Sequence, residues 1–202
     1  MATLLFYDND HTYEVDGERV PSVTELCSVL TASKYPPGAE IIRAAAARGT
    51  RVHELCELYD YGALTEFEPE LTGYLRAWQA FCRDYRPRWE RIEHRMGSAV
   101  DSFAGTADRI GIIDRARVVV DIKTTASMDR PSKIALAAQL HGYELLSLCT
   151  GAGACDGESM GVQLKKDGSY TVHRKTDVEA KYHFNSDELW EQLTYLYHLT
   201  KG

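Results

Sequence analysis

The stretch FAGTADRIGIIDRARVVVDIKT, residues 103–124, decides the fold that we expect. It contains two extended runs, 103–113 and 117–123, separated by a short polar interruption around Asp114. A third extended run, near 88–96, comes just before them. β-Branched and apolar residues on both sides of a polar turn are typical of antiparallel strands, so the sequence predicts a three-stranded meander.

The end of this meander carries two acidic residues and a lysine. Side chains alternate along a strand, so Asp121 and Lys123 should point to the same face of the sheet. With a turn at 114–116, Asp108 should lie nearly opposite Asp121, within roughly 5–8 Å. Carboxylates that close repel each other unless a cation lies between them, and a hard divalent ion with oxygen ligands meets that need. A structural Asp–Lys pair at a strand end remains the alternative, because the triplet Asp-x-Lys is common.

Helices and further strands surround the meander. A hairpin over 12–15 and 19–20 should turn at Asp16-Gly17, and Ser22 with Glu25 forms a capping box for a helix to about Leu30, ended by the break at 34–38. The other predicted elements are helices over 39–59 (interrupted at Gly49-Thr50), 69–85, 132–149 and from Ser186 onward, and strands over 160–164 and 170–174.

This order of elements predicts an α/β fold, with a central mixed sheet that includes the antiparallel meander and has helices on its faces. A chain of 202 residues, 44% of them hydrophobic, is long enough to bury one core. We expect one domain over 1–202: an N-terminal hairpin and helix at 1–38, a catalytic core at 39–150, and C-terminal strands and a helix at 151–202.

Composition indicates the compartment and leaves the partner open. The five cysteines lack the C-x-x-C spacing of zinc and redox sites, which favours a reducing cytoplasm. We expect no membrane partner, because no apolar stretch approaches the roughly 20 residues of a span and the N-terminus lacks a signal pattern. A net charge of -7 disfavours a nucleic-acid partner by itself. Carboxylates that hold cations also add negative charge, however, and DNA contacts can be confined to one basic patch.

Three more segments change the interpretation of the Asp-x-Lys triplet. GTADRIG, residues 105–111, places Asp108 on a strand between two glycines. QLHGY, residues 139–143, sets a glutamine and a tyrosine on one face of a helix. GTRVHELCE, residues 49–57, sets His53 on a helix, although a lone helical histidine is more often packed or solvated than a ligand.

In this order, G-T-x-V-H, G-x-x-D-R-I, D-I-K-T and Q-x-x-x-Y resemble the four motifs of the RecB-like exonucleases of the PD-(D/E)XK superfamily. The segment HTYEVDGERVPSVTEL is also similar to the start of phage-type members and of the mitochondrial genome-maintenance exonuclease. The resemblance extends from Thr12 to about Tyr143. It implies a restriction-endonuclease-like core and an exonuclease that uses Mg²⁺ or Mn²⁺, with two ions bound. Such an enzyme would hydrolyse linear DNA and leave 5′-phosphates, in recombination, repair or phage DNA processing in the cytoplasm of a bacterial or phage-infected cell.

The resemblance also implies which residues hold the metal. The ligands would be His53, Asp108, Asp121 and the backbone carbonyl of Ile122. Glu93, on the strand before Asp108, lies where relatives carry another acid. An ordinary exposed glutamate on a strand remains the alternative.

The catalytic roles follow from the same comparison. Lys123 would orient or deprotonate the attacking water, or offset charge on the phosphate. Gln139 and Tyr143 would shape the site from the neighbouring helix and touch DNA or the attacking water.

A phosphate site is expected near the N-terminus. The helix that begins after Ser22 presents free N–H groups and a positive dipole end to an anion. Related exonucleases hold a 5′-phosphate with a serine and an arginine in this region, which assigns Ser22 and Arg19. Thr124 and Arg51 are further candidates for DNA contact. A plain helix cap without a ligand remains the alternative.

The sequence also departs from some relatives. Without a C-x-x-C group we expect no iron–sulfur cluster, and without a GxxxxGK[ST] loop we expect no use of ATP.

The expected partners are linear DNA with a free end and a single-strand-annealing or recombination protein. Two other functions stay open: a structure- or sequence-specific endonuclease of the same superfamily, and a non-catalytic DNA-binding or inhibitory module. The intact Asp108, Asp121 and Lys123 argue against the second.

Overall fold

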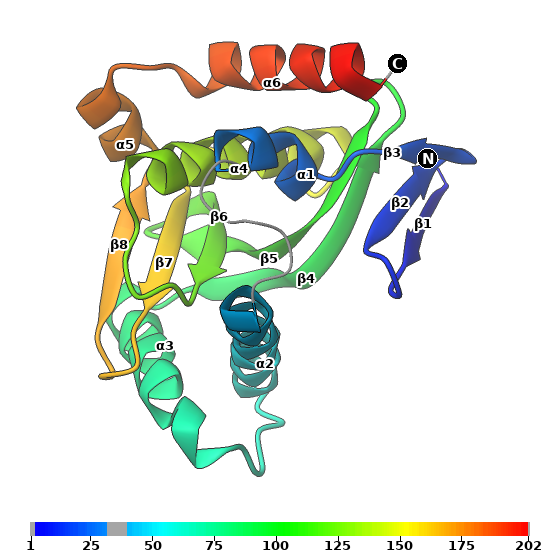
Figure 1. Cartoon of the computed structure of the whole chain (residues 1–202). Coiled ribbons are helices and arrows are strands. Elements are labelled where there is room, and N and C mark those ends of the chain that lie inside the picture. The colour runs from blue at the N-terminus through cyan, green and yellow to red at the C-terminus, as the bar shows by residue number, and fades with distance from the viewer. Residues whose placement is uncertain (1–2, 32–39, 202) are drawn as a thin grey trace.

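The computed structural model describes residues 3–31 and 40–201. Its centre is a five-stranded mixed sheet in the order β4-β5-β6-β7-β8 (Figure 1). Strands β4 (Arg88–Ser98), β5 (Phe103–Ile113) and β6 (Ala116–Lys123) form the predicted antiparallel meander. Strand β7 (Met160–Leu164) pairs with β6 in parallel, and β8 (Tyr170–Arg174) pairs with β7 antiparallel.

A two-residue turn sets the register of β5 and β6. The turn at 114–115 has positive φ at both positions, 50° and 71°, which is the signature of a type I′ hairpin. The ladder ends where Arg109 lies opposite Val120. Continued by one residue, this register sets Asp108 opposite Asp121, as the sequence predicts.

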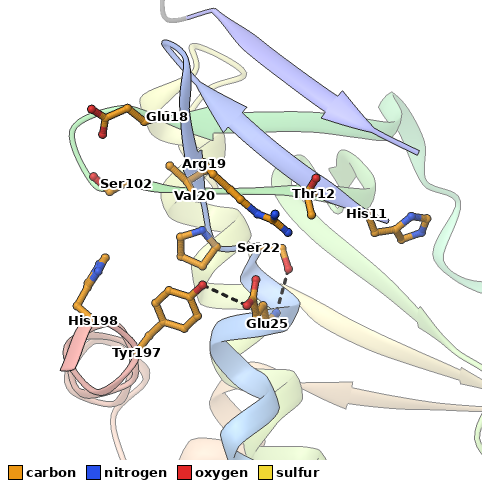
Figure 2. Close-up of a pocket in the computed structure, with 11 residues that line it drawn as sticks. His11, Thr12, Glu18, Arg19, Val20, Ser22, Glu25, Ser102, Tyr197 and His198 are labelled. Carbon is orange, nitrogen blue, oxygen red and sulfur yellow. Dashed lines mark hydrogen bonds between the residues drawn. The ribbon is translucent and has the colours of Figure 1, made fainter. Parts of the chain in front are cut away.

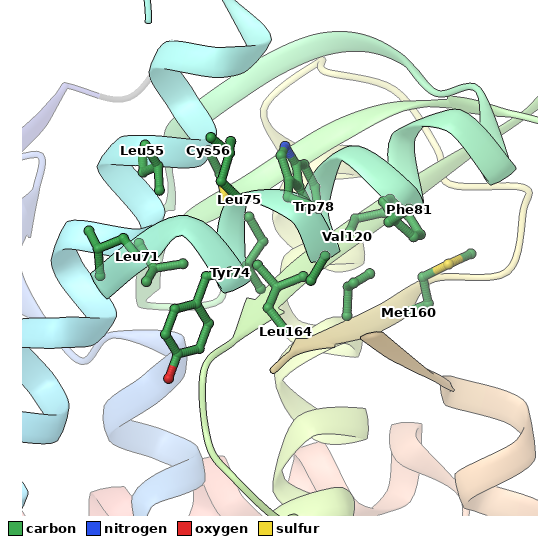
Figure 3. Close-up of a cluster of buried hydrophobic side chains, with 14 of the residues drawn as sticks. Leu55, Cys56, Leu71, Tyr74, Leu75, Trp78, Phe81, Val120, Met160 and Leu164 are labelled. Carbon is green, nitrogen blue, oxygen red and sulfur yellow. The ribbon is translucent and has the colours of Figure 1, made fainter. Parts of the chain in front are cut away.

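Helices cover both faces of the sheet. Helix α2 (Glu40–Asp60), the turn η3 (Pro69–Leu71) and α3 (Thr72–Tyr85) cover one face, where Trp78 and Phe81 pack against Val120 (Figure 3). On the other face lie α1 (Val23–Cys27), η1 (Ser28–Leu30), α4 (Arg130–Cys149) and α6 (Ser186–Lys201). Helix α5 (Lys175–Tyr182) connects β8 to α6.

Helix α4 makes the parallel pairing of β6 and β7 possible, because parallel neighbours need a long crossover connection. Its start is fixed by Asp129, whose carboxylate accepts the N–H of Ser132 at 3.1 Å. The helix carries Gln139 and Tyr143 past the end of β6.

A small antiparallel sheet lies beside β4 and β5. It consists of β1 (Leu4–Tyr7), β2 (Thr12–Val15) and β3 (Glu18–Val20). Tyr13 and Val15 pack on Ala104 of β5, which fixes this sheet to the main one. The predicted turn is confirmed, since Asp16 and Gly17 have φ of 52° and 85°.

Two predictions about helices have clear outcomes. The cap of α1 is confirmed, because the Ser22 hydroxyl accepts the N–H of Glu25 at 3.0 Å. The interruption at Gly49-Thr50 is wrong, since α2 runs through it and the Thr50 hydroxyl donates to the carbonyl of Ala46 at 3.3 Å. A mid-helix glycine costs only about 1 kcal/mol, which the packing of the buried face of α2 outweighs. The break predicted over 34–38 lies outside the described residues.

The α/β class and the central mixed sheet with helices on both faces are confirmed, and the arrangement is consistent with a PD-(D/E)XK core. Strand β1 and helix α5 were not predicted. In the described part of the chain, no helix has both the length and the apolar character that a membrane span requires.

Candidate active site

A cavity of about 980 Å³ lies between the main sheet, helix α2 and the small N-terminal sheet. It gathers most of the residues that the sequence singled out, although they come from five helices and strands and from two positions outside them, Ser22 and Thr124. Those that line it are Ser22, His53, Glu93, Asp108, Asp121, Ile122, Lys123, Thr124, Gln139 and Tyr143.

Three of these residues form a cluster able to hold a metal ion. His53, Glu93 and Asp108 each offer one ligand atom, and these atoms lie within 4.8 Å of one another. Nδ1 of His53 is 3.3 Å from Oδ1 of Asp108 and 4.0 Å from Oε1 of Glu93. Its Nε2 lies 3.1 Å from the carbonyl oxygen of Ile122, a contact that fixes the ring and leaves Nδ1 facing the carboxylates.

Main-chain and charge contacts hold Asp108 in place. The N–H of Ile122 donates to Oδ2 of Asp108 at 2.6 Å, so Oδ1 is left to face His53. Burial disfavours the charged forms of both side chains, but their mutual attraction outweighs it. The pKa of Asp108 is therefore lowered, and that of His53 is raised to about 9.

Glu93 reaches the cluster from an irregular part of β4. The backbone φ of Glu93 is +46°, in the left-handed region. Shortly before it, between Trp89 and Arg91, the pairing register of β4 with β5 shifts. Burial and the nearby charge of Asp108 raise the pKa of Glu93 to about 7. The structure thus brings this acid to His53 and Asp108, while Asp121 lies outside the three-residue cluster.

A buried arginine lies directly behind Glu93. The Arg109 side chain is 0% exposed, and its Nη1 donates to Oε1 of Glu93 at 3.1 Å and to the carbonyl of Asp108 at 2.6 Å. Its Nε donates to Oδ2 of Asp60 at 2.7 Å, and Asp60 also accepts the indole N–H of Trp78 at 3.0 Å. This network was not predicted from the sequence. Its only signal was a charged residue inside the apolar run of β5, since a buried charge needs a partner.

A second group of contacts runs from the end of β6 to α4. Nζ of Lys123 lies 2.7 Å from Oδ2 of Asp121 and donates to Oε1 of Gln139 at 2.9 Å. The amide of Gln139 then donates to the hydroxyl of Tyr143 at 3.1 Å. Burial raises the pKa of Asp121 to about 6; for Lys123, burial is outweighed by the Asp121 and Asp108 carboxylates, which raise its pKa.

The residues present fit a hard divalent cation. Apart from its ion pair with Lys123, Oδ2 of Asp121 is buried without a hydrogen-bond partner among the described residues. With Glu93, Asp108 and the His53 imidazole, the cavity supplies the oxygen and nitrogen donors that Mg²⁺ and Mn²⁺ accept. The Ile122 carbonyl faces His53 and retains a second lone pair for an ion.

The expected phosphate site is a separate, smaller cavity of about 330 Å³ (Figure 2). Arg19 and Ser22 both line it, and Ser22 also lines the larger cavity. The Ser22 hydroxyl is already engaged as the helix cap, and the carboxylates of Glu18 and Glu25 share the space. These acids oppose a phosphate, so the geometry brings the two residues together without making a purely basic pocket.

Arg51 does not line either cavity. Its guanidinium donates to Glu68 at 2.9 Å and to Glu70 at 3.0 Å, which ties α2 to η3. Two other arginines, Arg48 and Arg95, line the large cavity instead. The structure therefore places basic groups near the candidate site, though not the arginine that the sequence proposed.

No family model matches the chain, and no curated protein matches it significantly. Its structure is similar to that of SSO0001, with a TM-score of 0.38 and 15% identity over 83% of this chain and 75% of that protein. It is similar to an alkaline exonuclease, LHK-Exo from Laribacter hongkongensis, with a TM-score of 0.37 and 14% identity over 89% and 92% of the two chains. The same exonuclease in complex with dAMP gives a TM-score of 0.36 and 15% identity over 90% and 93%. Similarity this weak leaves the function to be argued from the site itself.

Proposed function

We propose that this protein is a metal-dependent deoxyribonuclease of the PD-(D/E)XK superfamily, of the RecB-like exonuclease kind. It would hydrolyse phosphodiester bonds of linear DNA and leave 5′-phosphates, without ATP. The observation that carries the proposal is the convergence of His53, Glu93, Asp108, Asp121 and Lys123 in one cavity. Three carboxylates, an imidazole and a lysine, drawn from α2, β4, β5 and β6, match the donor set and the cation that phosphodiester hydrolysis requires.

Each of these residues has a distinct task in the proposed reaction. His53, Glu93, Asp108 and Asp121 would hold Mg²⁺ or Mn²⁺, which when bound supplies Lewis acidity to the phosphate and lowers the pKa of water. Lys123 keeps a positive charge beside Asp121, where it favours the extra negative charge of the phosphate in the transition state.

Gln139 and Tyr143 act as positioning groups. Gln139 accepts a hydrogen bond from Nζ of Lys123, which restricts where that ammonium group points. The hydroxyl of Tyr143 in turn accepts from the Gln139 amide, and the ring is almost fully buried against β5. This chain of contacts supports an active enzyme over the non-catalytic DNA-binding or inhibitory module, because simple binding does not require an oriented lysine.

Digestion of end-labelled linear DNA, with and without a 5′-phosphate, tests the proposal. We expect cleavage in Mg²⁺ or Mn²⁺, binding without appreciable cleavage in Ca²⁺, and neither cleavage nor metal-dependent binding in excess EDTA. Covalently closed circular DNA should be spared by an exonuclease and nicked by the alternative, an endonuclease of the same superfamily. Robust cleavage in EDTA, or none in any divalent ion, would refute the proposal, and calorimetric stoichiometry tests for the two ions that the resemblance implies.

A further inference from the structure

One wall of the large cavity consists of aromatic rings and a guanidinium group. Phe6 of β1, His11, Tyr13 of β2 and Arg95 of β4 all line it. The ring centroid of Phe6 is 4.8 Å from that of Tyr13 and 5.5 Å from that of His11, and the Arg95 guanidinium carbon lies 4.2 Å over the Phe6 ring. We call Phe6, His11, Tyr13 and Arg95 the aromatic wall.

The aromatic wall lies next to two of the proposed metal ligands, Glu93 and Asp108, along strands β4 and β5. In the pairing of β4 with β5, Arg95 lies opposite Thr106, and the hydroxyls of Thr106 and Tyr13 are 2.8 Å apart. Two residues back along β4 is Glu93, and two residues on along β5 is Asp108. Two residues of a strand span about 7 Å, so a group bound at Glu93 and Asp108 has the wall as its immediate neighbour on the sheet.

The chemistry of this wall suits a nucleobase better than a phosphate. Asp8 lines the same part of the cavity, and its Oδ1 lies 3.9 Å from Nη2 of Arg95, which offsets the charge that a phosphate would need. Unpaired bases stack on aromatic side chains and on arginine planes, and this stacking tolerates any base sequence. In a duplex, base faces are covered by their neighbours, so rings in a cavity wall recognise bases that have left the stack.

We propose that the aromatic wall is a binding subsite for an unpaired base of the nucleotide next to the scissile phosphate. The substrate is therefore single-stranded DNA, or the frayed single-stranded end of a duplex. This inference rests on the proposed nuclease function and deepens it, because it names the strand state that reaches the metal site.

Oligonucleotides with single abasic positions test the subsite. Binding of labelled single-stranded DNA is measured in Ca²⁺ by fluorescence anisotropy while one abasic residue is moved along the strand. We expect one or two adjacent positions at which loss of the base weakens binding by about 5- to 150-fold, the range for a base stacked on an aromatic residue. Phe6→Leu and Arg95→Gln should each weaken binding of the intact strand, and the abasic residue should then cost little more.

Matched variants separate stacking from general damage. Tyr7→Leu removes an aromatic ring from the next position of β1, where the side chain faces outward and its hydroxyl donates to Glu14, and it should leave the abasic profile unchanged. Arg83→Gln removes an arginine that is 73% exposed on α3 and should also have no effect. Phe6→Trp keeps a ring and should restore the profile that Phe6→Leu loses.

The outcomes distinguish this inference from the function on which it rests. If the wild-type protein cleaves DNA in Mg²⁺ but no abasic position changes affinity, or Phe6→Leu keeps the full abasic effect, the subsite is refuted and the nuclease stands. Equal affinity for blunt duplex and single strand refutes it as well. If the wild-type protein neither binds nor cleaves DNA in any divalent ion, both proposals are overturned.

Discussion

Asp60→Asn gives the sharpest test of the charge network behind the candidate metal site. Asp60 and Arg109 have side chains that are 3% and 0% exposed, and Oδ2 of Asp60 accepts from Nε of Arg109 at 2.7 Å. Asparagine has nearly the same shape and retains an oxygen for the indole N–H of Trp78, so the change removes one charge and little volume. The guanidinium then stays buried with Glu93, which is 29% exposed, as its remaining ion-pair partner among the described residues.

Removing one partner of a buried ion pair costs about 3–5 kcal/mol, because the other charge is left without compensation. For a chain of this size each kcal/mol corresponds to about 2–4 °C, so the melting temperature should fall by roughly 6–20 °C. Thermal and urea unfolding in EDTA, followed by circular dichroism, measure this loss free of any metal contribution.

Glu90→Gln provides the matched control. Glu90 also pairs with an arginine, Arg117 at 3.0 Å, but the two side chains are 21% and 29% exposed. The same acid-to-amide change should therefore cost only about 0–1 kcal/mol, as for pairs that water can reach. A loss for Asp60→Asn no larger than that for Glu90→Gln would refute the reasoning that burial makes the Asp60–Arg109 pair important.

The same substitution has a second readout at the metal site. Arg109 donates to Glu93 and to the carbonyl of Asp108, so a displaced guanidinium should shift a ligand. Groups that orient metal ligands usually change affinity by about 10- to 100-fold, and we expect a weakening of that size for Mn²⁺ in calorimetry. In a Glu93→Ala background Asp60→Asn should add little, since its route to the ion has been removed. Full additivity would show that Asp60 does not act through Glu93.

Three other predictions concern the ligands, the lysine and the packing of two glycines. Asp108→Ala and His53→Ala should each weaken metal binding in calorimetry and abolish most hydrolysis; wild-type behaviour of the histidine variant would make it an ordinary helix residue. Lys123→Ala should leave metal affinity equal or higher, because a neighbouring positive charge is lost, while turnover falls by about 10²- to 10³-fold; a parallel loss of metal affinity would contradict this. Gly73→Ala should cost about 1–3 kcal/mol in urea unfolding, since its β-carbon would overlap the main chain of the β7–β8 turn, whereas Gly49→Ala, with its nearest neighbour 3.6 Å away, should gain about 0.5–1 kcal/mol.

The strands of the sheet were predictable because their signals are local. Alternation, β-branched runs and turn dipeptides lie within a few residues of the elements they specify, and β7 and β8 have the bounds that the sequence predicted. The interruption of α2 at Gly49 was wrong for the opposite reason. A glycine lowers local helix propensity, but the neighbouring turns of α2 are held by a core that sequence spacing does not show.

In the candidate site, too, contacts set by local patterns were predictable and contacts between distant residues were not. Strand alternation and one tight turn were enough to place Asp108 near Asp121 and Lys123, and helical spacing placed Gln139 beside Tyr143. The Asp60–Arg109 contact joins residues 49 positions apart, and the contact of His53 with Ile122 joins residues 69 apart. Such pairs depend on how α2 docks on the sheet, and the local patterns of a single sequence do not reveal that docking.

The type I′ turn between β5 and β6 has a consequence for the order of folding. A hairpin of this kind closes within microseconds from local contacts, so Asp108 and Asp121 meet early. Helix α2 brings His53 and Asp60 only when its much longer loop has closed, a slower step. The nascent hairpin therefore holds the two carboxylates with one ammonium group, that of Lys123, before His53 reaches Asp108. If the proposed divalent ion binds the hairpin at that stage, it would offset the remaining negative charge and speed the docking of α2, and the metal would then aid assembly as well as catalysis.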